Sequence, residues 1–265
     1  LPPPKTGDTI ETPFPPKSSY ARPEVVAADT TSPLKVLRFA PEGEVPLAPH
    51  VSVTFDKPMV AVTSHKDTVA AGVPVKITPE VKGDWRWVGA KTVLFEAPKQ
   101  TRLPMATEYT VDIPEGTKSK NGNTIAEAKS WTFKTPPAKV TTMWPQYGQR
   151  PLDQKMFLGF NQKIDPEKML EHVQVKSGVI FGGRQVVRLT PEEIDADPDI
   201  KRMAESANPD TWVAFKATSP LAYGSSVRVV VGKGAPSAEG PLLTDSAQSY
   251  SFSTYGAFVV SQARC

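Results

Sequence analysis

The first and second halves of the chain carry the same alternating sequence pattern. The apolar residues of 51–55 align without a gap on those of 156–160, and alternate residues of a strand point to one face of its sheet. Both stretches therefore predict a half-buried strand in the same register. Further strand patterns recur in the same order, with 92–95 returning as 212–215, 109–113 as 227–231 and 131–135 as 250–254. The chain is predicted to be two versions of one module.

The duplicated pattern predicts an all-β fold of two tandem antiparallel β-sandwiches. Short strands separated by turns roughly every ten residues are typical of such sandwiches. Pro136–Pro137 lies between the copies, and a linker this short and stiff predicts that the modules hold a fixed angle. The expected organisation is a Pro-rich extended tether at 1–34, a first sandwich at 35–135, a Pro-rich linker at 136–138, a second sandwich at 139–255 and the start of a further segment at 256–265. An ordered arm packed on a module is the alternative for the tether.

The second copy carries an insertion that predicts a helix near residues 190–206. Thr190 is a favourable N-cap residue, Pro191 suits the first helical position and Glu193 suits the capping-box position. Pro198 lies inside this span and should break it into short helical pieces. The second sandwich is therefore expected to differ from the first by a short helical insertion.

Composition narrows the classes of function. The 31 Lys and Arg residues are scattered among 28 Asp and Glu residues, and no basic block indicates a nucleic-acid partner. Apolar runs fall short of the roughly 18 residues that a membrane-spanning helix needs, so no membrane span is predicted. Cys265 is the only cysteine, which excludes an internal disulfide and a Cys-based zinc site. We interpret it as a free thiol or as a partner for a cysteine further along, rather than as a nucleophile.

Two polar clusters contain residue types that can carry chemistry. Asp195, Asp197 and Asp199 have the spacing of the first ligands of a calcium loop, but the glycine and the bidentate glutamate that such a loop needs are replaced by Ile200 and Ser206. A solvated acidic helix face is the preferred interpretation.

The second cluster is Ser64, His65 and Asp67, the residue types of a hydrolytic triad. Triad members converge from distant parts of a fold, so these neighbours predict a polar loop instead. His50, His65 and His172 lack the spacing of metal ligands and are interpreted as structural or exposed. No catalytic, cofactor-binding or metal-binding residue is predicted.

Trp85 and Trp87 are the candidates for a partner contact. Two residues apart on a strand, they share one face, and a paired aromatic face could stack on a sugar or on a partner protein. The alternative, which we favour, is that both rings face the core and Arg86 points outward. The second copy supports this alternative, since Trp212 occupies a nearby place there.

The first copy resembles a known family. Its Val51–Met59 segment (VSVTFDKPM), its Asn121–Gly122–Asn123 turn and its closing Trp131–Thr135 (WTFKT) are similar to bacterial Ig-like modules. Together with Trp85–Gly89 (WRWVG), they resemble more narrowly the N-terminal region of bacterial alpha-2-macroglobulins. In the second copy Asn161–Ile164 departs from this pattern, so its assignment depends on the repeat.

The resemblance implies two tandem Ig-like β-sandwiches in a scaffold fragment of a protease trap. It implies a location in the bacterial periplasm or cell envelope, with attachment to the membrane only through an upstream anchor. It also implies contacts with downstream domains of the same polypeptide, and proteases as partners of the full-length protein. It also implies a thioester elsewhere, because no Cys-Gly-Glu-Gln-like stretch occurs here. The competing hypotheses are adhesive or glycan-binding modules that use Trp85 and Trp87, and an enzyme, for which no convergent set of titratable residues is found.

Overall fold

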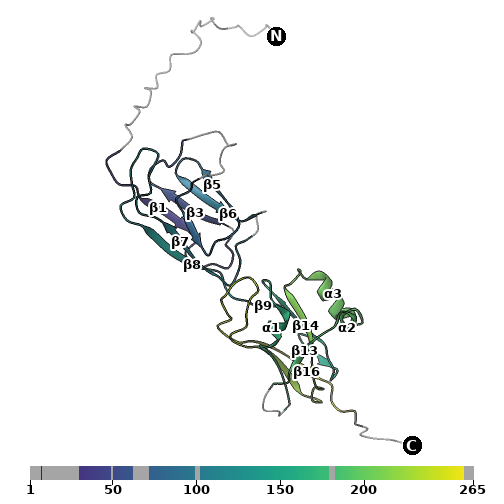
Figure 1. Cartoon of the computed structure of the whole chain (residues 1–265). Coiled ribbons are helices and arrows are strands. Elements are labelled where there is room, and N and C mark those ends of the chain that lie inside the picture. The colour runs from purple at the N-terminus through teal and green to yellow at the C-terminus, as the bar shows by residue number, and fades with distance from the viewer. Residues whose placement is uncertain are drawn as a thin grey trace, which may run out of the picture.

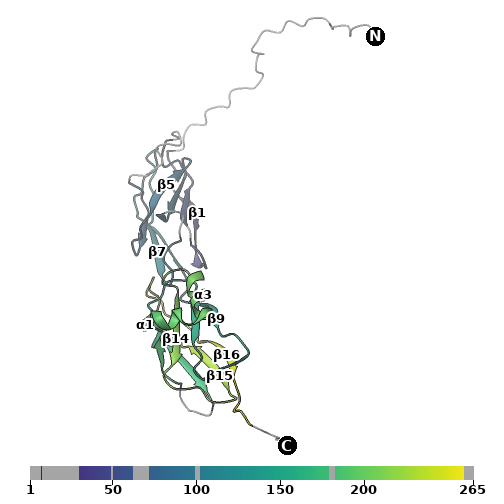
Figure 2. The same ribbon diagram turned by 90° about the vertical axis from the view of Figure 1, so that its right-hand side faces the viewer.

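Two β-sandwiches lie end to end in the computed structural model of the chain (Figure 1). The structure describes residues 7, 30–48, 50–61, 72–98, 102–178 and 183–259. The arrangement is narrow in both perpendicular views, so the two modules form a short rod (Figures 1 and 2).

The first module packs two four-stranded sheets face to face around one core. One sheet has, in spatial order, β1 (Val36–Ala40), β3 (His50–Phe55), β6 (Thr92–Glu96) and β5 (Asp84–Val88). The other has β2 (Gly43–Glu44), β8 (Lys129–Lys134), β7 (Glu108–Ile113) and β4 (Lys76–Thr78). Gly122, at a φ of 87°, lies in the predicted turn between β7 and β8.

The second module repeats this topology strand for strand. One sheet has, in spatial order, β9 (Val140–Trp144), β11 (Met156–Phe160), β14 (Trp212–Ala217) and β13 (Val186–Arg188). The other has β10 (Gln149–Arg150), β16 (Gln248–Thr254), β15 (Ser226–Val231) and β12 (Val173–Ser177). The identical strand order confirms the duplication. The pairing departs from the expected antiparallel pattern at the edges of the sheets: β2 and β10 pair in parallel with β8 and β16, and an isolated parallel bridge joins Leu34 to Ile125.

The aligned alternating residues form the two cores. Val51, Val53 and Phe55 of β3 are completely buried, and so are Met156 and Leu158 of β11. Burial of such side chains contributes about 1.5–3 kcal/mol each, which makes any other register of these strands unfavourable.

The helical insertion covers the outer face of the second module. The predicted N-cap, Thr190, and capping box start α2 (Pro191–Asp195), and the chain then breaks and restarts at α3 (Pro198–Ser206), as the internal proline predicted. Ile200 of α3 is fully buried against Phe157 and Ala214, so β11 is buried on both faces. The structure adds a helix that the sequence analysis missed, α1 (Pro166–Leu170), capped by Asp165.

The start of the first module lies slightly earlier than expected. Leu34 was assigned to the tether, but its side chain is buried in the first core and its backbone bridges to Ile125. In the described ranges, none of the helices has the length and hydropathy of a membrane span.

Candidate functional site

A threonine closes each module in the same way. The Thr135 hydroxyl accepts a hydrogen bond from the Thr107 N–H (3.1 Å) and donates to the Pro104 carbonyl (3.0 Å). The Thr254 hydroxyl repeats this with the Ser225 N–H (3.0 Å) and the carbonyl of Ala222 (2.5 Å), the residue that corresponds to Pro104. These hydroxyls are buried, which explains why a threonine ends the strand pattern of both copies.

The backbone beside each threonine also has one shape. Ala106 and Gly224 both have a φ of 53°, and each donates its N–H to the residue that follows the closing threonine, at Pro136 and Tyr255 (3.0 and 2.8 Å). We call residues 102–107 with 135–138 the first module end, and residues 220–225 with 254–257 the second module end.

A carboxylate of the second module is inserted into the first module end. Glu239 accepts two hydrogen bonds from the Arg102 guanidinium, at 2.5 and 2.8 Å, and a third from the Met105 N–H at 3.0 Å. The Lys163 N–H, in the second module, donates to the other carboxylate oxygen at 2.7 Å. The Glu239 side chain is only 12% exposed, so a single, largely buried carboxylate joins the two modules.

The residues that follow Glu239 contact the backbone of the first module directly. Gly240 lies so close that a Cβ there would be 2.1 Å from the Thr107 hydroxyl and 2.4 Å from the Ala106 carbonyl oxygen. Leu242 donates its N–H to that carbonyl at 2.7 Å. We call residues 237–242 the docking loop; it sets the modules' separation through backbone contacts that only glycine permits at position 240.

The electrostatics keep the docked carboxylate ionised. Burial alone would raise the pKa of Glu239, but the Arg102 guanidinium and the N–H groups of Lys163 and Met105 outweigh it and hold the pKa below its usual value. The ion pair is therefore intact at neutral pH.

Sequence reasoning did not find this contact. Arg102 and Glu239 are 137 residues apart in the chain. No local spacing connects them, and only the fold brings them together. The signal that was available is the repeat, which predicts a short linker and therefore a contact somewhere between the two module ends.

The predicted candidates Trp85 and Trp87 lie on the edge strand β5, half-buried. Both rings pack inward, Trp85 on Phe95 (ring centroids 5.1 Å apart) and Trp87 on Phe55 (6.5 Å). Trp85 also lines a cleft of about 410 Å³ that opens between the two sheets beside β4. The rings are thus partly core and partly accessible, and their use as a contact stays a prediction.

The neighbours of these tryptophans are also placed by the structure. Arg86 points outward, as expected, and makes a bidentate ion pair with Glu96 at 3.0 and 2.8 Å. Trp212 lies on β14, which pairs with the strand that corresponds to β5, and it stacks on Phe157 beneath the helical insertion. The second module has Val186 and Arg188 on the strand that corresponds to β5.

The aspartates of the calcium-like spacing are all engaged within the helical insertion. Asp195 pairs with Lys201 at 3.1 Å, and Asp199 pairs with Arg202 at 2.8 Å. Asp197 caps the N-terminus of α3. Among the described residues no group of three His, Cys, Asp or Glu side chains is placed to hold a metal ion.

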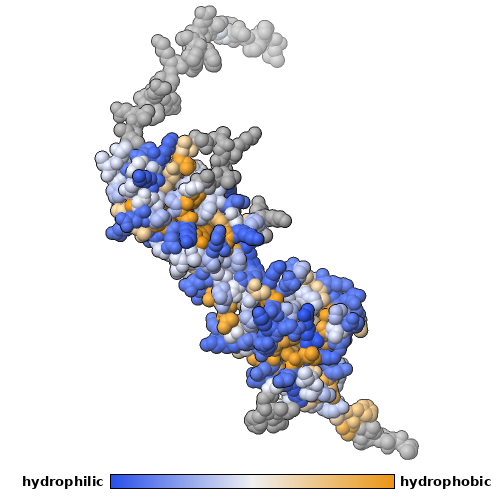
Figure 3. All heavy atoms as spheres, viewed as in Figure 1, coloured by the Kyte–Doolittle hydropathy of each residue, from blue (hydrophilic) through white to orange (hydrophobic). Residues whose placement is uncertain are grey.

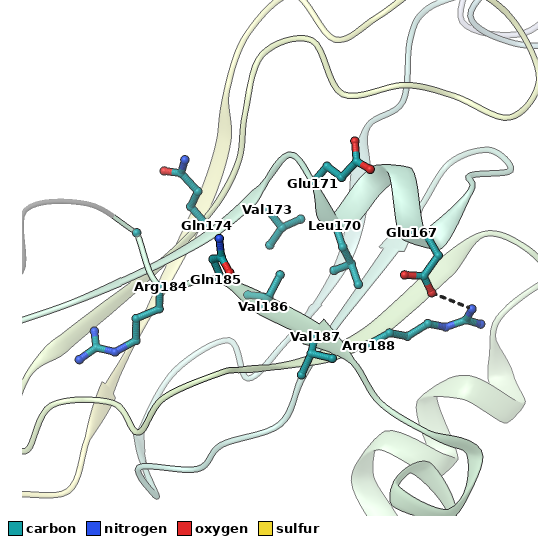
Figure 4. Close-up of a pocket in the computed structure, with 11 residues that line it drawn as sticks. Glu167, Leu170, Glu171, Val173, Gln174, Arg184, Gln185, Val186, Val187 and Arg188 are labelled. Carbon is teal, nitrogen blue, oxygen red and sulfur yellow. Dashed lines mark hydrogen bonds and ion pairs between the residues drawn. The ribbon is translucent and has the colours of Figure 1, made fainter.

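A second cleft, of about 680 Å³, opens on the same flank of the second module, between α1 and the strands β12 and β13 (Figure 4). Its middle is formed by Leu170, Val173 and Val186, and its rim carries an ion pair between Arg188 and Glu167 (3.4 Å). The charges are mixed in sign and lie at the rim, so they do not converge on one point as catalytic groups do.

The remaining sequence candidates are placed as follows. His50 is exposed on β3, and the backbone carbonyl of His172 accepts from Gly232 at 2.8 Å. Ser64, His65, Asp67 and Cys265 lie outside the described residues, and so do residues 1–29 of the predicted 1–34 tether except residue 7.

Comparison with known proteins places the first module. Residues 29–135 match the family model described as bacterial Ig-like domain. The chain is also 29% identical over 161 residues to circularly permutated Ras protein 2 of Dictyostelium discoideum, a match over 58% of this chain. The chain spans about 4% of the length of that curated relative.

Two solved structures are similar to this chain at low TM-scores. L,D-transpeptidase 3 from Mycobacterium tuberculosis matches 59% of this chain at 17% identity with a TM-score of 0.25, and the match spans 57% of that chain. Native alpha-2-macroglobulin from Escherichia coli matches 84% of this chain at 13% identity with a TM-score of 0.28, over 72% of that chain. Neither score reaches 0.5, so the assignment of the fold depends on the sheets and the family model. On these two grounds, the protein has an all-β fold of Ig-like β-sandwiches.

Proposed function

We propose that this chain is a non-catalytic scaffold segment that holds its two Ig-like sandwiches at a fixed angle within a larger envelope protein. The observation that carries the proposal is the docked Glu239, which is bonded to both modules at once. A flexible linker would keep the modules near each other, but a second attachment point fixes their orientation. A fixed rod suits a spacer that positions other domains.

The finer assignment follows the resemblance of the first module. We assign the chain to the N-terminal scaffold of a bacterial alpha-2-macroglobulin-like endopeptidase inhibitor in the periplasm or cell envelope. Its direct partners are then downstream domains of the same polypeptide, and proteases are met only by the full-length protein. Reading the whole gene for a Cys-Gly-Glu-Gln-like thioester stretch tests this assignment, and its absence overturns it.

The scaffold role is tested by measuring the distance between the modules. Ser130 and Ser249 are exposed and occupy equivalent positions on β8 and β16. Spin labels on cysteines at these positions, in a Cys265→Ser background, report the distance distribution by electron–electron double resonance. We expect a narrow distribution in the parent chain. A broad distribution there would refute a rigid scaffold.

The docking loop supplies the matched perturbation. Gly240→Ala places a methyl group on the backbone of the first module and should broaden the distribution. Gly7→Ala is the control, because a Cβ at Gly7 has nothing within 4 Å. Unchanged distributions in both variants would mean that the docking loop does not set the angle.

The cleft beside Trp85 favours a second candidate, glycan binding. An accessible indole above an apolar floor can stack on a sugar ring. Titration with N-acetylglucosamine oligomers, followed by tryptophan fluorescence, tests it with Trp85→Ala as the deficient variant and Trp212→Phe as the control. Identical titrations of the parent chain and Trp85→Ala would remove this candidate.

A further inference from the structure

The two module ends have the same backbone but opposite exposure. Met105 and Ala106 are 3% and 0% exposed, because the docking loop of the second module covers them. The corresponding residues are Tyr223 and Gly224, and Tyr223 is 65% exposed. The second module therefore presents, uncovered, the surface that the first module uses to hold its neighbour.

The backbone groups that bind the docking loop are also duplicated. In the first module end the Met105 N–H and the Ala106 carbonyl bond to the loop. Their counterparts are the Tyr223 N–H and the Gly224 carbonyl, for which the described part of the chain provides no partner. The closing threonine and the residue with a φ of 53° hold both pairs in the same shape.

The side chains around the second module end are apolar and exposed. Tyr255 is 52% exposed, and Phe258 and Val259 are 93% and 75% exposed where the chain leaves the module. Figure 3 shows hydrophobic residues there, directly before the grey atoms at the C-terminal end. The exposed rings of Tyr223 and Tyr255 belong to the same module end as the unpaired backbone groups, which indicates a surface that is covered in the assembled protein.

We infer that the second module end is a docking site for a further Ig-like module on the same polypeptide. That module would approach with the loop between its last two strands, as residues 237–242 approach the first module end. The path of the chain favours this occupant, because residues 255–257 leave the second module end as residues 136–138 leave the first. The inference rests on the proposed scaffold function and extends it to a specific surface.

The chemistry of the site also selects its occupant. Arg102, which binds the Glu239 carboxylate, has Pro220 as its counterpart in the second module. A loop that inserted a carboxylate there would bury a charge without a cation, which is strongly unfavourable. The occupant's loop therefore has a small residue where Gly240 lies and an uncharged residue where Glu239 lies.

A three-module fusion tests this. Residues 138–255 are appended after Gly256, which gives the second module end a neighbour whose loop carries copies of Glu239 and Gly240. In this fusion Pro220→Arg supplies the missing cation. Spin-label distances are measured between the second and third modules, and in parallel between the first and second, with circular dichroism melts to confirm folding.

The expected result is a broad distance distribution between the second and third modules with Pro220. With Pro220→Arg it should become as narrow as the distribution between the first and second modules, and Gly240→Ala in the appended module should broaden it again. Suppose that the Pro220→Arg fusion gives a broad distribution between the second and third modules and a narrow one between the first and second. That result overturns this inference but leaves the scaffold function standing. A broad distribution for the first two modules overturns the scaffold function and this inference together.

A second copy of the chain is the competing occupant. Light scattering of the 265-residue chain distinguishes it: the inference expects a monomer at all concentrations. Growth in mass with concentration that Tyr223→Glu abolishes would assign the site to self-association and overturn the assignment to a neighbouring module.

Discussion

Replacing Glu239 by alanine should release the modules from their fixed angle. The substitution removes both hydrogen bonds to Arg102 and leaves the Met105 N–H without its acceptor. Lys163 is exposed, so its N–H can bond to water instead. The effect on docking therefore comes from two sources, the ion pair and the buried amide.

The size of the effect follows from the exposure of each group. Arg102 is 27% exposed and regains water, so loss of the pair costs only about 1 kcal/mol. The N–H of Met105 is in a residue that is 3% exposed, and an unsatisfied buried donor costs about 1–3 kcal/mol. The docking free energy should fall by about 3 kcal/mol, which raises the ratio of undocked to docked molecules on the order of a hundredfold.

The spin-label distance between Ser130→Cys and Ser249→Cys measures this directly, and small-angle scattering gives an independent view. We expect a broadened distance distribution and, in small-angle scattering, a wider cross-section of the rod. The modules should not dissociate, because the linker still tethers them. Glu205→Ala, on an exposed helical position, is the control. A distribution for Glu239→Ala as narrow as that of the parent would refute the reasoning that this carboxylate holds the angle.

Three more outcomes are expected. The pKa of Glu239 is depressed in the folded chain, so the contribution of its carboxylate to docking is present above the usual pKa of 4.5 and is lost as the pH falls through the lower folded-state pKa. The distance distribution should therefore broaden in the parent when the pH is lowered well below 4.5, but change little in Glu239→Ala. Thr135→Val and Thr254→Val keep the shape but remove the hydroxyl, and each should destabilise its module by about 1–3 kcal/mol in urea unfolding, whereas serine at either position should retain most of the stability. Ile200→Ala should cost about 2–5 kcal/mol in the second module and lower its helical circular dichroism signal; an unchanged unfolding midpoint would contradict the packing of α3 on β11.

Local sequence signals predicted most of the fold. Alternation predicted the paired core strands because a one-residue slip would expose every buried side chain. The start of α2 was predicted because a capping residue followed by proline marks it at Thr190–Pro191, and Pro198 predicted the break before α3. The same signal at Asp165–Pro166 was missed, since the helix it starts has only five residues and no periodic pattern.

Contacts between distant segments were beyond local reasoning. The parallel pairing of β2 with β8 involves two residues, too few for any periodicity. The half-buried state of Trp85 depends on how far β4 and β5 separate at the open flank of the sandwich, and alternation only says which face of the strand the ring occupies.

The fixed angle itself shows why the sequence argument needed the structure. Pro136–Pro137 restricts its own φ angles, but rotation remains at the residues on either side, so a proline linker alone limits the swing of the modules without defining one orientation. Orientation is defined only when a second contact closes a loop between the same two bodies. Glu239 and Gly240 make that contact on a surface that the duplication has built twice. Rigidity of this pair is therefore a property of the complementary docking loop, and a module end without a matching loop should leave its neighbour free to swing.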